Sequence, residues 1–133
     1  MKVFIDVNIV MYASGGPHAY REPSARLLER IVRDELEAVS DVEILQEILY
    51  RFWRLNRIEV AVKMIEQVVS VIPALLPIEV SDGVLAASLL SQHPQIEPRD
   101  AVHAAVMFRH RITYLYSYDH HFDDIPGLTR LEP

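Results

Sequence analysis

Short apolar runs alternate with longer amphipathic stretches along the chain. Residues 1–5 form an apolar, β-branched run that is typical of a buried strand. The runs "ELEAVS" (35–40), "ITYLYSY" (112–118) and "LTRLE" (128–132) also predict strands, and the prolines of "SVIPALLPI" (70–78) leave only strand or irregular structure there. Between these runs, apolar residues recur at helical spacing. They predict helices over about residues 24–33, 40–55, 58–69, 81–92 and 98–111.

Local signals indicate where several elements begin. The stretch "SGGPHAYREP" (14–23), rich in Gly and Pro, predicts a loop. Ser40 and Glu43 have the spacing of a capping box, so we expect a helix to begin at Ser40. An ordinary role for Asn8 would be to cap a short helix that starts at Ile9.

Strands separated by helices predict an α/β fold built from βαβ units. Such units form a parallel sheet that is covered by helices on both faces. We find no internal repeat or linker, and 133 residues suit a single domain that spans residues 1–133. In open parallel sheets, ligands bind beyond the carboxyl ends of the strands. Functional residues are therefore expected directly after the strands.

Four acidic residues occupy such positions or can reach them. Asp6 and Asp119 follow strands, Asp100 lies at the start of a helix, and Glu47 borders the apolar stripe of another helix. Each has an ordinary alternative role: Asp6 as a turn or cap residue, Asp100 as a partner of the helix dipole, Glu47 in an ion pair with Arg51, and Asp119 in a solvated loop. Four close carboxylates repel one another unless a cation neutralises them. Oxygen ligands alone favour Mg²⁺ or Mn²⁺ over zinc or copper.

The net charge of the protein also favours a bound metal ion. The chain has 19 acidic residues against 13 Lys plus Arg, a formal net charge of −6. Such a protein is a poor passive binder of nucleic acid, because phosphate neutralisation supplies most of that affinity. A bound metal would supply local positive charge. Arg51, Arg54 and Arg57 recur every three residues on one helix, and they form either a solvated face or a basic strip that binds RNA phosphates.

The absence of cysteine excludes several kinds of site. A disulfide framework, a thiolate zinc site and a cysteine nucleophile all need this residue, and the chain has none. This composition fits a cytoplasmic setting. No signal peptide is expected, and no apolar stretch is long enough to cross a membrane.

Four segments, taken in order and spacing, resemble the PIN-domain family and most closely the ribonuclease toxins of VapBC-type toxin–antitoxin pairs. They are "FIDVNIVMYA", "LQEILYRF", "EPRDAVHAAVM" and "YSYDHHFDDIPGLTRLEP". The resemblance covers essentially the whole chain. It implies a three-layer α/β/α sandwich around a mostly parallel sheet of about five strands. It also implies Mg²⁺- or Mn²⁺-dependent endonucleolytic cleavage of RNA.

The resemblance also implies roles for individual residues. The acidic metal ligands and catalytic residues would be Asp6, Glu47, Asp100 and Asp119. Asn8 and Ser117 match supporting polar positions, and Asp123 matches an often acidic position that would hold a second metal or a bridging water. The partners implied are an RNA substrate, a cognate antitoxin protein and a second copy of the chain in a homodimer.

Two other functions are compatible with this kind of fold. A non-catalytic PIN-fold binding module would usually have lost one of the four acids, and none is missing here. A metal-dependent phosphatase or phosphoacceptor protein would need a lysine near the last strands. The chain's only lysines are Lys2 and Lys63, which disfavours this alternative.

Overall fold

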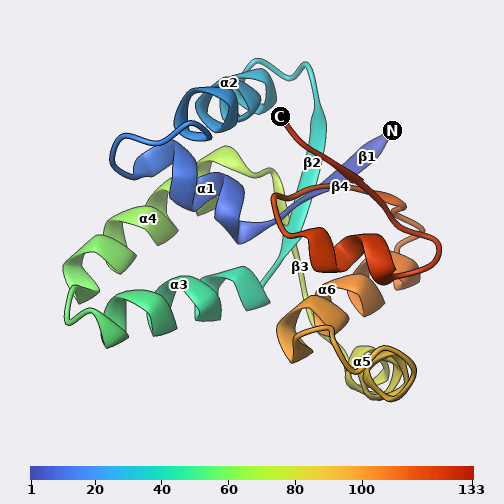
Figure 1. Ribbon diagram of the computed structural model, residues 1–133. Coiled ribbons are helices and arrows are strands. Elements are labelled where there is room, and N and C mark those ends of the chain that lie inside the picture. The colour runs from blue at the N-terminus through green and yellow to red at the C-terminus, as the bar shows by residue number, and fades with distance from the viewer.

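The computed structural model describes residues 1–133 and has three layers, with helices on both faces of a central sheet (Figure 1). The sheet has five strands in the order β3-β2-β1-β4-β5, and every neighbouring pair is parallel. The strands are β1 (Lys2–Ile5), β2 (Glu37–Asp41), β3 (Ala74–Leu76), β4 (Tyr114–Tyr116) and β5 (Thr129–Leu131). The predicted α/β sandwich with about five mostly parallel strands is confirmed.

Helices connect the strands. They are α1 (Val7–Ser14), α2 (Arg21–Val32), α3 (Glu43–Arg54), α4 (Ile58–Val71), α5 (Val80–Gln92) and α6 (Pro98–Arg109), with a short 3₁₀ helix, η1 (His120–Asp124). None of these helices has the length and apolar character that crossing a bilayer requires. Because all strands are parallel, their carboxyl ends meet at one edge of the sheet.

Alternation along β1 builds two hydrophobic cores. Val3 and Ile5 face one side of the sheet, where they pack with residues from α1, α2, α3 and α4. Phe4 faces the other side and packs with residues of α5 and α6. All three side chains are fully buried. Burial on both faces fixes the register of β1, because a slip of one residue would exchange the two cores.

The predicted start of the third helix is wrong. Ser40 belongs to β2, and its hydroxyl donates a hydrogen bond of 2.7 Å to the backbone carbonyl of Ile5. The helix begins at Glu43 instead, where Asp41 Oδ1 accepts a hydrogen bond of 3.0 Å from the Glu43 backbone N–H. A contact with the neighbouring strand therefore takes the hydroxyl that the capping box would have used.

The first helix also begins earlier than predicted. α1 starts at Val7, and its N-cap is Asp6 rather than Asn8. Asp6 Oδ1 accepts a hydrogen bond of 2.7 Å from the Val7 backbone N–H. The strand–helix connection therefore has almost no loop, and this fixes the Asp6 carboxylate at the carboxyl edge of the sheet.

Candidate metal centre

One pocket at the carboxyl edge of the sheet brings the four predicted acids together. It has a volume of about 430 Å³, and its lining includes Asp6 after β1, Glu47 from α3, Asp100 from the first turn of α6 and Asp119 after β4. Asn8 also lines it. Side chains up to 113 residues apart in the chain thus face one space, as the parallel topology predicts.

Asp6 lines this pocket and is 4% exposed. Its Oδ2 accepts a hydrogen bond of 2.6 Å from the Ser117 hydroxyl. Burial raises the pKa of Asp6, an effect that the His103 charge and the Ser117 hydrogen bond oppose and the nearby Glu47 charge reinforces. The carboxylate is therefore costly to ionise without a further positive charge.

Ser117 joins the two strand ends that carry Asp6 and Asp119. Its hydroxyl oxygen accepts hydrogen bonds from Asn8 Nδ2 at 3.2 Å and from the Asp119 backbone N–H at 3.0 Å. Asn8 Oδ1 in turn accepts from the Tyr118 backbone N–H at 3.4 Å. Asn8 and Ser117, predicted as supporting residues, thus connect the start of α1 to the end of β4.

Asp100 carries the least satisfied group in the pocket. The residue is 3% exposed, and its Oδ2 is buried with no hydrogen-bond partner. Burial, the charge of Asp6 and the neighbouring carboxylate of Asp119 raise the pKa of Asp100 to about 8. A buried carboxylate oxygen without a partner needs a proton or a cation. The donor set therefore fits a hard divalent metal ion.

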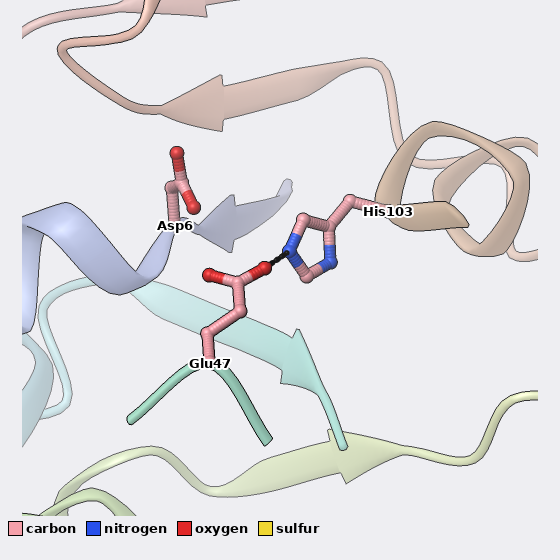
Figure 2. Close-up of side chains that lie close together, drawn as sticks. All are labelled: Asp6, Glu47 and His103. Atoms are coloured by element: carbon pink, nitrogen blue, oxygen red, sulfur yellow. Dashed lines mark hydrogen bonds and ion pairs between the residues drawn. The ribbon is translucent and has the colours of Figure 1, made fainter. Parts of the chain in front are cut away.

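Glu47 is engaged by a histidine rather than by Arg51. His103 Nε2 lies 2.8 Å from Glu47 Oε1, and His103 Nδ1 lies 2.7 Å from Asp41 Oδ2 (Figure 2 shows the Glu47–His103 contact). Burial opposes the charged imidazolium, but the hydrogen bonds and charges of Asp41 and Glu47 outweigh it and raise the pKa of His103 well above its usual value. The alternative of an exposed Glu47–Arg51 pair is wrong, because Glu47 is only 5% exposed.

Asp119 lies at the outer side of the pocket, and 29% of its side chain is exposed. Its Oδ1 accepts a hydrogen bond of 2.9 Å from the His121 backbone N–H and caps η1. Possible ligand atoms lie within 4.8 Å of one another inside each of two separate groups. One group comes from Asp6, Glu47 and His103, and the other from Asp100, Asp119 and His121. The second group includes Asp100, whose Oδ2 has no hydrogen-bond partner.

Asp123 does not join this cluster, contrary to the prediction. Its Oδ1 accepts a hydrogen bond of 3.0 Å from Arg130 Nε, and Arg130 Nη2 lies 3.3 Å from its Oδ2. The hydrogen bond from Arg130 lowers the pKa of Asp123 below its usual range. Arg130, on β5, thus takes up the carboxylate that was expected beside a second metal or a bridging water.

Only part of the predicted basic strip lines the pocket. Arg51 and Arg54 do so, together with Arg99 of α6. Arg57 does not, because its Nε donates a hydrogen bond of 2.7 Å to Glu59 Oε1 outside the pocket. A pocket lined by both carboxylates and arginines can bind a cation and an adjacent polyanion together.

Sequence reasoning missed Asp41 as a member of the site. It directly follows the predicted second strand, as Asp6 and Asp119 follow theirs, so the placement rule that found them applies to it. The apparent capping box drew attention to the helix start instead. The residue is fully buried at the end of β2.

Comparison with known proteins places the chain among nucleases. The PIN domain profile matches residues 3–128. Ribonuclease VapC13 of Mycobacterium tuberculosis is 37% identical over 129 residues, which cover 97% of this chain and 98% of the relative. Ribonuclease VapC23 of the same species is 29% identical over 121 residues, which cover 89% and 93%.

Solved structures share the fold over nearly the full length. The M. tuberculosis protein VapC20, described as a sarcin–ricin loop cleaving toxin, superposes with a TM-score of 0.77 at 19% identity and covers 98% of this chain and 99% of its own. VapBC2 of Rickettsia felis, bound to a DNA fragment from its promoter, gives a TM-score of 0.76 at 17% identity, with 99% and 98% covered. At these identities the likeness supports the fold alone.

Proposed function

Because this chain belongs to the PIN-domain family, we propose that it is a Mg²⁺- or Mn²⁺-dependent endoribonuclease that hydrolyses RNA phosphodiester bonds. The relative at 37% identity is named a ribonuclease. The observation that carries the proposal is the unpartnered, buried Oδ2 of Asp100 in a pocket with three further acids. Such an oxygen is stable as part of a cation site and costly otherwise.

The residues that would hold the metal are Asp6, Asp100 and Asp119, with Glu47 as a further ligand, directly or through water. A divalent ion held by them would make a nearby water more acidic and would neutralise charge that develops on the phosphate. In-line attack of water on phosphorus would expel the 3′-oxygen and leave a 5′-phosphate. Either Asp119 or Asp100 would accept the proton of the attacking water.

Other residues of the pocket would bind and orient the substrate. The guanidinium groups of Arg51, Arg54 and Arg99 are suited to RNA phosphates, because they offer charge-assisted hydrogen bonds next to the carboxylates. Ser117 and Asn8 would hold Asp6 and Asp119 in place through the hydrogen bonds described above. The net charge of −6 makes this local positive group necessary for RNA binding.

We further propose that the protein is the toxin of a toxin–antitoxin pair and that a cognate antitoxin protein binds it. This proposal is supported by relatives that are described as toxins or studied as toxin–antitoxin complexes, including those of Klebsiella pneumoniae and M. tuberculosis. Homodimerisation remains a prediction from the resemblance. Sedimentation of the isolated chain tests it directly.

The experiment is cleavage of a single-stranded RNA with and without Mn²⁺, by the wild type, Asp6→Asn and Asp100→Asn. We expect both variants to lose more than about 100-fold in rate, because changes outside the ligand set already cost up to that amount. Asp124→Asn, on an exposed residue of η1, is the control and should cleave normally. Undiminished cleavage by Asp6→Asn and Asp100→Asn would rule out the proposal.

The non-catalytic binding module makes a different prediction for the same experiment. It expects no Mn²⁺-dependent cleavage by the wild type and no metal binding. The presence of all four acids in one pocket disfavours it. No lysine lines that pocket, which also disfavours the phosphatase or phosphoacceptor alternative.

A further inference from the structure

Three buried side chains are connected in series behind the pocket. Asp41 at the end of β2, His103 in α6 and Glu47 in α3 are connected by contacts of 2.7 and 2.8 Å through the two nitrogens of the imidazole. Asp41 and His103 are 0% exposed and Glu47 is 5% exposed. Of the three, only Glu47 lines the pocket. His103 contacts the site through Glu47, and one of its ring nitrogens also lies within 4.8 Å of an Asp6 carboxylate oxygen.

Each contact in this series of three side chains restricts the next residue. Asp41 is held at both oxygens, because Oδ1 accepts from the Glu43 backbone N–H and Oδ2 contacts His103. His103 is held at both ring nitrogens, which leaves neither nitrogen free to bind a metal. Glu47 is then held at Oε1. Figure 2 shows its other oxygen turned away from the ring, on the side of Asp6.

We propose that Asp41 and His103 are positioning residues of the metal centre: Asp41 orients the His103 ring, and the ring holds Glu47 so that its remaining carboxylate oxygen is directed at the bound cation. This inference rests on the proposed function. A glutamate has several rotatable bonds, and fixing them before the metal arrives removes an entropic cost from binding. Outer partners that orient metal ligands are a general feature of metal sites.

A purely structural role is the competing explanation, because the same contacts join β2, α3 and α6. The two explanations differ in what a substitution changes. A structural tie affects the stability of the protein and leaves the metal affinity of the folded molecules intact. A positioning role lowers that affinity even where the variant is fully folded.

The test is calorimetric titration of Mn²⁺ into the full-length wild type, His103→Gln and Asp41→Asn. We expect Mn²⁺ to bind 10- to 100-fold more weakly to both variants, the usual range for residues that orient a ligand. Asp41→Asn keeps the side-chain volume and an acceptor for the Glu43 N–H, so it provides a folded variant if His103→Gln does not fold. Affinities within about twofold of the wild type in a folded variant would overturn the proposal.

Asp82→Asn is the matched control. Asp82 is 2% exposed and paired with Arg109 away from the pocket, so its loss removes a buried carboxylate interaction of similar kind. We expect this variant to unfold more easily and to bind Mn²⁺ as the wild type does. An equal loss of affinity in Asp82→Asn would assign the effect to general destabilisation and contradict the proposal.

A double-mutant cycle tests whether the two residues act through Glu47. Asp41→Asn should weaken Mn²⁺ binding in the wild-type background and have almost no further effect in Glu47→Gln, because the group to be positioned is altered. Independent, multiplying effects would contradict the inference. If the wild type cleaves RNA and the variants bind Mn²⁺ as tightly as it does, only this inference is contradicted. If the wild type binds Mn²⁺ but cleaves no RNA, only the proposed nuclease function is contradicted.

Discussion

A carboxylate oxygen that is buried without a hydrogen-bond partner, as Oδ2 of Asp100 is, costs free energy unless a proton or a cation compensates it. The neighbouring carboxylates of Asp6 and Asp119 increase that cost, and together with burial they raise the pKa of Asp100 to about 8. Without a metal, the ionised carboxylates of the site therefore destabilise the folded protein. We interpret this as stability that the protein gives up for function.

Asp100→Asn should therefore stabilise the metal-free protein at alkaline pH while it abolishes cleavage. At pH 9 the wild-type carboxyl is ionised, whereas the amide is neutral and nearly the same size. We expect the free energy of unfolding in EDTA to rise by about 1 kcal/mol or more. Denaturant unfolding at pH 9 measures this, with Asp124→Asn as an unchanged reference, and a clear loss of stability would contradict it.

The arginines of the pocket lead to a second prediction for single residues. Arg51→Gln should raise KM for RNA and reduce the salt dependence of binding by about one counterion, because Arg51 lines the pocket. Arg57→Gln is the matched control, since Arg57 pairs with Glu59 instead. Binding to a labelled RNA at several salt concentrations measures both slopes. Equal effects of the two variants would contradict the assignment.

Among the helices, α6 carries residues of the site near its start and a stabilising contact with α5 near its end. Asp100 and His103 lie near its start, and Arg109 near its end holds α5. Arg109 Nε and Nη2 each donate a hydrogen bond of 2.9 Å to Asp82, and Nη2 also donates to the Pro77 carbonyl at 2.9 Å. These contacts join the last turn of α6 to α5 and to Pro77, away from the pocket, so they stabilise the fold without touching the site.

Asp82→Asn should lower the free energy of unfolding by about 2 kcal/mol, because hydrogen bonds to a charged partner contribute on that order. Arg109 lowers the pKa of Asp82, so the wild type's advantage should shrink as pH falls below about 4, where the unfolded carboxyl is already protonated. Urea unfolding of both proteins at pH 7 and pH 3 measures this. The same difference at both pH values would contradict the argument.

Helices and strands were predicted better than the contacts of individual polar side chains. Ser40 and Glu43 have a capping-box spacing, but the Ser40 hydroxyl bonds to Ile5 on the neighbouring strand. Asp123 has an acidic position close to Asp119, but Arg130 from the last strand binds it. In both cases a contact between residues far apart in the sequence outweighs a local pattern. Single-sequence reasoning has no access to such contacts.

At the scale of the whole molecule, the topology was predictable because it follows from periodicity. The alternation of strands and helices indicates a parallel sheet, and a parallel sheet gathers the strand ends at one edge. Asp6 and Asp119 were found by that rule. The buried contact of Glu47 with His103 was not, because it depends on how α3 and α6 pack, and Asp41 was hidden by the wrong helix start.

The ionisable groups of the metal centre also make the free energy of unfolding of the whole protein depend on pH. Asp6, Asp100 and His103 all have raised pKa values, so near neutral pH the folded protein binds more protons than the unfolded chain. The loss of stability caused by ionising Asp100 is absent below pH of about 4 and complete above pH of about 8. The contribution of His103 is present below pH of about 6.5 and lost as pH rises through its higher folded pKa.

In EDTA, the free energy of unfolding should therefore fall between pH 6 and pH 9. Saturating Mg²⁺ should oppose this fall, because the cation competes with the bound protons and binds better as they leave. Thermal unfolding across this range, with and without Mg²⁺, measures both trends. A metal-free protein that gains stability toward pH 9 would contradict the description of the centre.

We propose above that one divalent cation binds between Asp6, Asp100 and Asp119, which follow β1, lie in the first turn of α6 and follow β4. A crystal grown with Mn²⁺, measured for anomalous scattering at the manganese edge, tests it most directly. We expect an anomalous peak between Asp6, Asp100 and Asp119, within about 2.5 Å of the carboxylate oxygens. A well-occupied peak elsewhere, or none in this pocket at saturating Mn²⁺, would contradict it.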